Sequence, residues 1–207
     1  MTMTLFPVQL QLEGRRVIII GGGAVALRRF HLVKNCGADV TIVSPSFLPE
    51  LEEAASDCTL IHRRLQAEDV ENAFLLILAA PDEEAAVIAY GSSALVNDAV
   101  DASRGDLHIP QQLTHGRLQI TISTGGAGPA YTKKLKEQIE QLLPSGIEAH
   151  IDYLYELRQH MKQSPLPEDL RREILREAAL LPETEGARAS FTVYVNRMLT
   201  DAGGDKL

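Results

Sequence analysis

Three consecutive glycines follow a run of β-branched residues near the start of the chain, and their spacing suits a phosphate-bearing ligand. Gly21 and Gly23, with Ala26 three positions later, give the pattern G-x-G-x-x-A. The first glycine permits a tight turn, the second lets a pyrophosphate approach the backbone, and the small third residue lets helix and strand pack closely. The following helix directs about half a positive charge toward the phosphates. The pattern therefore predicts a dinucleotide-binding turn; a turn that binds nothing would gain little from three glycines.

The end of the second expected strand decides how the adenosine ribose of such a ligand is held. Where the pattern usually has an acidic residue, this chain has Ser44, Pro45 and Ser46. A serine hydroxyl or backbone groups must then hold the ribose. Without the acidic residue, the sequence distinguishes less clearly between NAD and NADP as the cofactor. Arg28 and Arg29 offer charge for a 2′-phosphate, but they lie on the helix rather than after the strand, so we favour NAD.

A further contact with the cofactor is expected at the end of the fourth strand, because ligands bind outside such sheets near the point where the strand order reverses. Ala79, Ala80 and Pro81 occupy that end, although small residues there also serve packing alone. The predicted cofactor-binding residues are Gly21, Gly23, Ala24, Val25, Ser44, Pro45, Ser46, Ala79, Ala80 and Pro81.

A second glycine-rich turn, residues 124–129, precedes a helix that carries Lys133, Lys134 and Lys136. The chain has 20 Lys and Arg against 28 Asp and Glu, a net charge of −8, which opposes nonspecific binding to nucleic acid. An anionic ligand must therefore find a local basic pocket. The three lysines are candidates for it, with a solvated helix face as the alternative interpretation. Further candidates are Arg104, His108, His115 and Arg117.

The elements that must position these residues alternate between strand and helix in the first half of the chain. Strands are expected over residues 16–20, 39–43, 59–63 and 74–79, with a last one at 96–97. Helices are expected over residues 24–35, 47–55 and 85–95, the last opened by acidic residues from 82 onward. Strand–helix–strand units demand parallel strands covered by helices. The pattern therefore predicts a Rossmann-type α/β sheet.

The second half of the chain has a different pattern. Residues 117–123 alternate apolar and polar, as a half-buried antiparallel strand does, and residues 130–143 form an amphipathic helix. Residues 147–207 contain no β-rich run and predict two or three helices, separated at residues 164–167 and 181–183. We therefore expect a small α+β region followed by a C-terminal helical region.

Length and composition limit the class of protein. At 207 residues, with 45% hydrophobic and 23% charged residues, the chain fits one full globular domain plus an appendage. The longest strongly apolar stretch, residues 73–80, is too short to cross a bilayer, so we expect a soluble, cytoplasmic protein with no membrane partner. The sequence has no histidine or cysteine spacing typical of a metal site, so none is predicted.

Several of these stretches together resemble the precorrin-2 dehydrogenases of siroheme synthesis, a family that also forms the N-terminal module of siroheme synthases. The resemblance runs over residues 5–144. It is carried by residues 6–8, 21–29, 78–82, 96–101, 109–110 and 123–136, in family order. It implies NAD-dependent oxidation of precorrin-2 to sirohydrochlorin and a homodimer formed through the middle region. In these terms residues 1–113 are a NAD-binding Rossmann domain, 114–146 a dimerisation and tetrapyrrole-binding region, and 147–207 a helical C-terminal region.

The resemblance also implies site residues. A carboxylate after the last strand of the sheet would act as general base, and the family's Asn-Val-Val-Asp run is one residue longer here, which leaves Asp98 and Asp101 as candidates. We choose Asp101, although it could instead be a turn residue that bonds its own backbone. The predicted substrate-binding residues are His108, Thr124, Gly125, Gly126, Lys133, Lys134 and Lys136.

Three other functions compete with dehydrogenation alone. Some members of the family also insert Fe²⁺ into sirohydrochlorin, and the same aspartate would serve; the altered aspartate region makes us favour the dehydrogenase alone. A regulatory NAD-sensing module would need no basic cleft for a tetrapyrrole. A dehydrogenase of a small metabolite would leave the second glycine turn and the lysine helix without a role.

Overall fold

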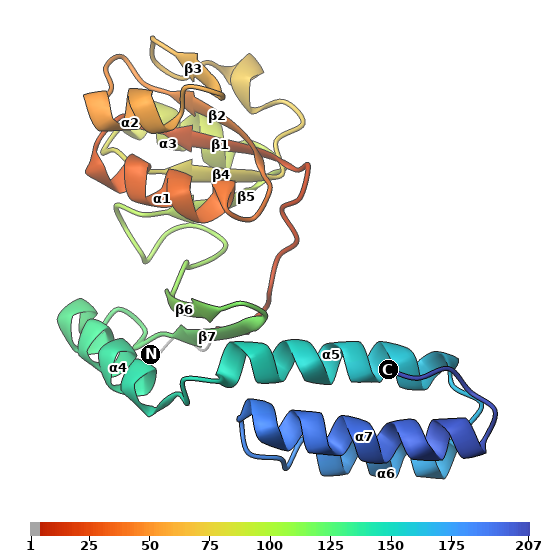
Figure 1. Cartoon of the computed structure of the whole chain (residues 1–207). Coiled ribbons are helices and arrows are strands. Elements are labelled where there is room, and N and C mark those ends of the chain that lie inside the picture. Colours follow the sequence, from red (N-terminus) through yellow and green to blue (C-terminus); the bar gives the residue numbers. More distant parts are fainter. Residues whose placement is uncertain (1–4) are drawn as a thin grey trace. The chain divides into compact units, whose positions relative to one another are not determined.

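The computed structural model describes residues 5–207. The chain divides into two compact units, residues 1–109 and residues 110–207 (Figure 1). In the part of the chain that is described, no helix is long and apolar enough to cross a membrane.

The first unit is built on a five-stranded parallel sheet. Its strands are β1 (Arg16–Ile20), β2 (Asp39–Val43), β3 (Thr59–Ile61), β4 (Leu75–Leu78) and β5 (Leu95–Asp98). They lie in the order β3-β2-β1-β4-β5, and every neighbouring pair is parallel. The chain adds strands on one side of β1 and then crosses back to β4 on the other. The strand order therefore reverses between β1 and β4, which confirms the Rossmann-type α/β sheet.

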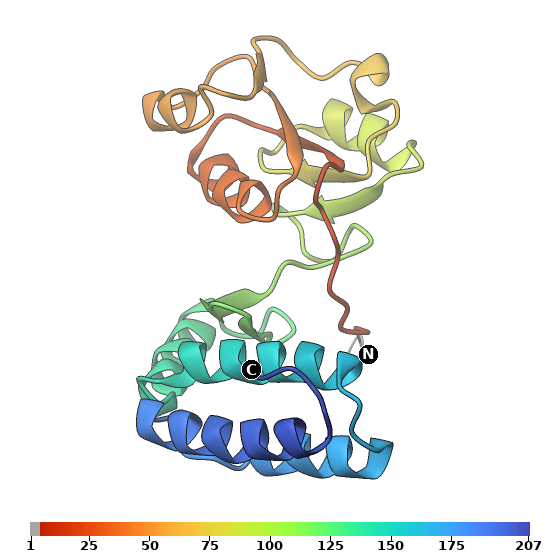
Figure 2. The ribbon, with the colours of Figure 1, turned by 45° about the vertical axis from the view of Figure 1, so that its right-hand side comes forward.

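Helices cover both faces of this sheet (Figure 2). One hydrophobic cluster joins β1, β2 and β4 to α1 (Ala24–Lys34) and α2 (Pro49–Ala54). A second cluster joins the opposite side of the strands to α3 (Glu83–Tyr90). Successive strand residues face opposite sides, so Ile18 enters the second cluster and Ile19 the first, and both are fully buried. A sheet buried on both faces requires the continuous apolar strands that the sequence shows.

Two elements of the first unit differ from the prediction. The helix expected over residues 85–95 ends at Tyr90, because Gly91 caps it and Leu95 already pairs with Leu75 in the sheet. Residues 67–70, for which no element was predicted, form the short 3-10 helix η1 (Ala67–Val70). Its capping box pairs Gln66 with Asp69.

The second unit begins with a hairpin of β6 (Gln111–His115) and β7 (Leu118–Ile122), which pair antiparallel. The strand expected over residues 117–123 is thus confirmed as antiparallel, but its partner β6 was not predicted. Of the β6 residues only Leu113 is buried, so the strand carries almost no apolar signal. The predicted domain boundary after residue 113 would cut through β6. The division between the two compact units falls just before this strand, between residues 109 and 110.

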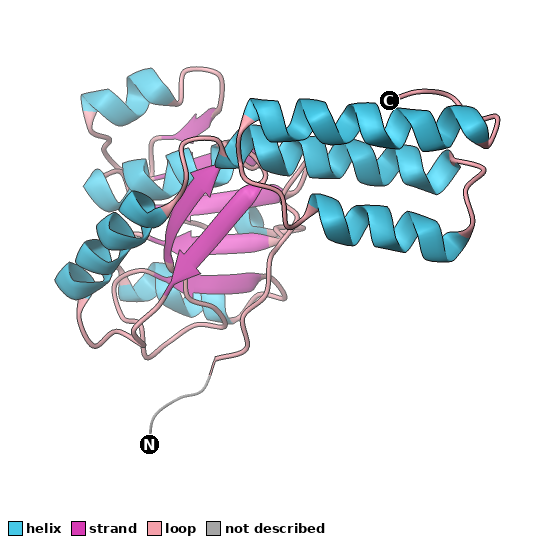
Figure 3. Cartoon of the chain, turned by 60° about the horizontal axis from the view of Figure 1, so that its bottom comes forward, coloured by secondary structure: helices cyan, strands magenta, loops and turns pink. Residues whose placement is uncertain are grey.

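Helices make up the rest of the second unit. Helix α4 (Pro129–Leu142) packs on the hairpin, and it is followed by α5 (Ile147–Gln163), α6 (Glu168–Ala178) and α7 (Glu185–Asp201). Figure 3 shows the last three lying side by side. They share a hydrophobic cluster of their own, with Leu157, Ile174 and Leu199 fully buried. The helical C-terminal region and both of its breaks are therefore confirmed.

Candidate functional site

The first candidate site lies where β1 and β4 end. Gly21 follows β1 with φ +126°, a conformation that L-residues rarely adopt. A Cβ at this position would lie 3.0 Å from the Cβ of Ala80, which follows β4. The N–H of Ala79 donates to the carbonyl of Ile20 at 2.8 Å and holds the two strand ends together. The structure thus brings together Gly21, Ala79 and Ala80, as the sequence predicts.

Gly22 joins the glycine turn to the loop after β2. A Cβ on Gly22 would lie 1.9 Å from the carbonyl oxygen of Ser46, so no side chain fits here. The carbonyl of Gly22 also accepts a hydrogen bond from the N–H of Leu48 at 2.8 Å. The G-x-G-x-x-A pattern assigns no role to its second position, so sequence reasoning missed this packing contact.

Gly23 and the first turn of α1 are open to solvent. Nothing lies within 4 Å of a Cβ placed on Gly23, and both Gly23 and Ala24 are exposed. Within the described residues, no side chain caps this helix and its first turn contains no acidic residue. Ala26 is fully buried in the core below. Free N–H groups at a helix N-terminus bind phosphates, so the turn fits the pyrophosphate of a dinucleotide.

The loop after β2 has fewer groups available to bind a ribose than the sequence suggests. Ser44 is 7% exposed, and its hydroxyl donates to the carbonyl of Ser46 at 2.7 Å. Its hydroxyl proton is therefore already used within the loop. Pro45 and Ser46 are exposed beside it, as is Pro81 after β4, while Val25 is half-buried on α1. A ribose at this edge would meet Ser46 and backbone groups rather than a free Ser44 donor.

The two candidate carboxylates differ sharply in their surroundings. Asp98 ends β5 and is 6% exposed; its Oδ2 accepts the hydroxyl of Tyr90 at 2.7 Å, and its Oδ1 accepts the N–H groups of Val100 and Asp101 at 2.9 and 2.8 Å. Burial acts to raise the pKa of Asp98, but the hydrogen bonds from Asp101, Tyr90 and Val100 outweigh it and the pKa lies below its ordinary value. Asp98 is an internal carboxylate whose oxygens are both engaged.

Asp101 is exposed at the start of the loop after β5. Its Oδ1 accepts hydrogen bonds from the hydroxyl and the N–H of Ser103, at 2.7 and 2.9 Å. These bonds hold the pKa of Asp101 below its ordinary value. The residue does bond its own turn, as the alternative interpretation expects, but its carboxylate stays accessible. In the same loop the His108 ring nitrogen Nε2 lies 2.7 Å from the carbonyl oxygen of Ala102.

The predicted substrate-binding residues of the second unit surround the start of α4. Gly125 and Gly126 both have positive φ, and a Cβ on either would meet open space. The Thr124 hydroxyl lies 3.0 Å from that of Thr132 and ties the turn to the helix. The lysines Lys133 and Lys134 are exposed, and Lys136 is half-buried. The second unit thus presents lysines and an open glycine turn on adjoining parts of the chain.

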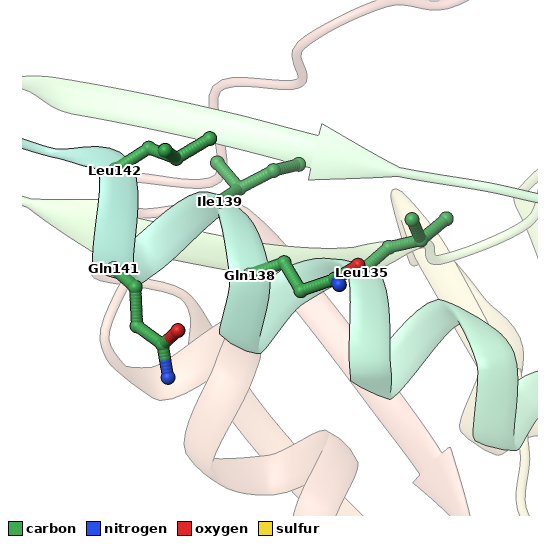
Figure 4. Close-up of a pocket in the computed structure, with 5 residues that line it drawn as sticks. All are labelled: Leu135, Gln138, Ile139, Gln141 and Leu142. Carbon is green, nitrogen blue, oxygen red and sulfur yellow. The ribbon is translucent and has the colours of Figure 1, made fainter.

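A pocket of about 490 Å³ also lies along α4. Its lining consists of Leu135, Gln138, Ile139, Gln141 and Leu142. Figure 4 shows that Leu135, Ile139 and Leu142 point to the same side of the helix, while Gln141 points away from it. None of these residues is charged or belongs to the predicted site. Leu142 is 81% exposed, so the pocket is part of an incompletely covered apolar face.

Comparison with protein-family models gives two matches in chain order. Residues 8–111 match a family described as NAD(P)-binding. Residues 115–142 match the central region of sirohaem biosynthesis proteins. The first match covers the parallel sheet with its glycine turn, and the second covers β7, α4 and the turn between them.

Curated relatives and a solved structure agree with these matches. The precorrin-2 dehydrogenase of Bacillus subtilis (strain 168) is 36% identical over 160 residues, which span 74% of this chain and 98% of that protein. The precorrin-2 dehydrogenase of Priestia megaterium is 31% identical, over 84% of this chain and 88% of the relative. The structure of SirC, a precorrin-2 dehydrogenase, has a TM-score of 0.80 and 28% identity, covering 93% of this chain and all of that one. The chain therefore belongs to the precorrin-2 dehydrogenase family.

Proposed function

We propose that this chain catalyses the NAD-dependent dehydrogenation of precorrin-2 to sirohydrochlorin in siroheme synthesis. The observation that carries the proposal is the open glycine turn at the reversal of the strand order, in a chain that spans 98% of the Bacillus subtilis relative. The turn has the backbone geometry that a dinucleotide needs. The substrate is inferred from the relatives, which are precorrin-2 dehydrogenases.

The pyrophosphate would be held by the backbone of Gly21, Gly23, Ala24 and Val25 at the start of α1. Ala79, Ala80 and Pro81 would pack against the nicotinamide half, and Ser44, Pro45 and Ser46 would line the ribose. NAD, when bound, supplies the acceptor for the hydride that leaves the macrocycle.

Asp101 would take the proton that leaves the macrocycle. Its carboxylate is exposed and, with a pKa below its ordinary value, is ionised at neutral pH, which is the state from which a general base acts. Its hydrogen bonds with Ser103 orient one oxygen and leave the other free among the described residues. Asp98 is unsuited to this role because Tyr90 and two backbone N–H groups engage both of its oxygens.

The substrate is a polycarboxylate, and the chain has a net charge of −8, so a concentrated basic site must overcome the repulsion. We assign contacts with substrate carboxylates to His108 in the first unit and, in the second unit, to the start of α4 with its lysines Lys133, Lys134 and Lys136. Thr124, Gly125 and Gly126 would add hydroxyl and N–H donors. Lysine ammonium groups act as point charges rather than bidentate forks, so each should contribute affinity without fixing orientation.

We also propose a cytoplasmic homodimer formed through residues 114–146, with neither nucleic acid nor membrane as a partner. The exposed Leu142 and the apolar pocket along α4 support a protein contact on this region. The net negative charge supports the absence of a nucleic-acid partner.

One anaerobic experiment tests the function. Purified protein, NAD and precorrin-2 are mixed, and NADH and sirohydrochlorin are followed by their absorption spectra; we expect the two products in equal amounts. Asp101→Asn should lower kcat by about a hundredfold or more, with NAD affinity unchanged. Asp39→Asn, which alters an exposed carboxylate at the start of β2, is the matched control. Failure of the unaltered chain to form NADH would overturn the proposal, and later addition of Fe²⁺ tests whether iron insertion follows.

A further inference from the structure

Tyr90 and Asp98 form a hydrogen-bonded pair behind the loop that carries Asp101. Tyr90 is the last residue of α3, and Asp98 is the last residue of β5. The Tyr90 hydroxyl donates to Asp98 Oδ2 at 2.7 Å. The contact joins a helix on one face of the sheet to the end of the edge strand β5. The G-x-G-x-x-A pattern does not predict it.

The second oxygen of Asp98 holds the backbone of Asp101. Oδ1 accepts the N–H of Asp101 at 2.8 Å and that of Val100 at 2.9 Å. The chain then turns back, because the N–H of Arg104 donates to the carbonyl of Asp101 at 3.1 Å. One carboxylate therefore fixes the first residues of the loop, and the exposed Asp101 side chain projects from a backbone held on both sides.

Arg104 also contacts the ring of Tyr90. Its guanidinium lies 5.1 Å from the centroid of the Tyr90 ring and donates to Glu83 Oε1 at 3.0 Å. Glu83 and Tyr90 are the first and last residues of α3, so this helix meets the loop at both of its ends. Among the described residues, the charged or titratable side chains that act on Asp98 are Tyr90 and Arg104, and Arg104 is held by Glu83.

We infer that Tyr90 and Asp98 are positioning residues for the oxidation of precorrin-2, and that they act by fixing the backbone of Asp101 so that its carboxylate meets the substrate in one orientation. The inference rests on the proposed function, because it requires Asp101 to be the proton acceptor. It adds a role for two residues that do not touch the substrate.

The pair needs an ionised Asp98. The three donors, two N–H groups and one hydroxyl, all point at carboxylate oxygens, and a proton on Asp98 would displace one of them. Desolvation, and then the hydrogen bond to Asp98, raise the pKa of Tyr90 to about 12, so its hydroxyl remains a donor over the working pH range. Removal of that hydroxyl should therefore let Asp98 take up a proton at a higher pH.

The test variant is Tyr90→Phe, which removes only the hydroxyl and keeps the ring under Arg104. We expect kcat for precorrin-2 oxidation to fall about fivefold to twentyfold, with the KM for NAD within a factor of two. The acid limb of the kcat profile should move to higher pH. In hydrogen exchange measured without substrate, the amides of Val100 and Asp101 should exchange at least several times faster.

Two controls separate positioning from general destabilisation. Tyr194→Phe makes the same chemical change at a half-exposed tyrosine of α7, 47% exposed, and should alter none of these readouts. Val87→Gly weakens α3 at a 70% exposed position without touching Asp98. It should lower thermal stability and leave the acid limb where it is in the unaltered chain.

The outcomes distinguish this inference from the proposed function. If Asp101→Asn abolishes turnover while Tyr90→Phe keeps the kcat, the pH profile and the amide exchange of the unaltered chain, the positioning role is overturned and the proposed function stands. If Asp101→Asn turns over normally, the positioning role and the assignment of Asp101 as proton acceptor are both overturned, while the dehydrogenase function stands. If the unaltered chain does not oxidise precorrin-2, the proposed function is overturned as well. Loss of kcat in Tyr90→Phe with an unmoved acid limb and unchanged amide exchange would also contradict positioning.

Discussion

Gly22 and Ser46 approach so closely that a Cβ on Gly22 would lie 1.9 Å from the Ser46 carbonyl oxygen. The neighbouring Gly23 has nothing within 4 Å of its own Cβ position. The two adjacent glycines thus have different roles. Gly22 lets the loop after β2 pack against the glycine turn, and Gly23 leaves the start of α1 accessible. A substitution of Gly22 should therefore affect the stability of the fold, and a substitution of Gly23 should affect cofactor binding.

Gly22→Ala is therefore predicted to destabilise the protein, because the backbone of Ser46 must move to admit the new methyl group. We expect a loss of about 1–3 kcal/mol in the free energy of unfolding, measured by urea denaturation. Gly186→Ala is the control: Gly186 is the second residue of α7 with nothing within 4 Å of its Cβ position, so the change should not destabilise the protein. Equal stability of Gly22→Ala and the unaltered chain would contradict the packing described here.

Asp69 is predicted to make the stability of the first unit sensitive to acid. It is 7% exposed and accepts hydrogen bonds from Arg63 at 2.6 and 2.8 Å and from the N–H of Gln66 at 2.8 Å. The bonds from Arg63, with that from Gln66, hold the pKa of Asp69 below its ordinary value despite burial. A lowered pKa in the folded state means that the stabilisation is complete above about pH 4 and is lost as pH falls through the folded value.

The corresponding variant is Asp69→Asn. We expect it to lose about 1–2 kcal/mol at pH 7 relative to the unaltered chain, with the difference shrinking as pH falls below about 4. Urea denaturation at a series of pH values measures both. A difference that stays constant down to pH 2 would show that the charge of Asp69 contributes nothing.

The lysines of α4 are predicted to act on substrate affinity alone. Lys133→Gln or Lys134→Gln should raise the KM for precorrin-2 about threefold to tenfold at low salt, and less at high salt because the attraction is screened. NAD affinity should not change. Lys162→Gln, at an exposed lysine of α5, is the control and should leave the KM unaltered. A rise in KM that persists at high salt would argue against a charge contact.

The first half of the fold was predictable because its signals are local. Residues 16–20 and 39–43 are apolar runs rich in β-branched residues next to clear turns, and the structure begins and ends both strands where the sequence predicts. The end of α3 was missed although Gly91, Ser92 and Ser93 form a helix-stop signal in the sequence, and the pairing of Leu95 with Leu75 is a long-range contact that the sequence does not show. Strand β6 was missed because burial of Leu113 alone leaves no alternating pattern.

The candidate site was only partly predictable for the same reason. Spacing identified Gly21, Gly23 and Ala26, because the strand, the turn and the helix that define their pattern are consecutive in the sequence. The choice between Asp98 and Asp101 depends on which side chain is buried, and the two lie only three residues apart at the end of β5 and just after it. Asp98 is buried and accepts a hydrogen bond from Tyr90 on α3, a long-range contact that sequence order does not reveal. The roles of these residues in catalysis stay predictions until they are tested as above.

The most direct test of the central claim is the affinity for NAD after substitution of Gly23. Asp and Asn both cap helices well at this position, so Gly23→Asp and Gly23→Asn should fold with unchanged or slightly raised thermal stability. Asp places a negative charge where the pyrophosphate would lie, so titration calorimetry should show NAD bound at least about tenfold more weakly by Gly23→Asp than by Gly23→Asn. Equal NAD affinity in Gly23→Asp, Gly23→Asn and the unaltered chain would contradict the proposed cofactor site.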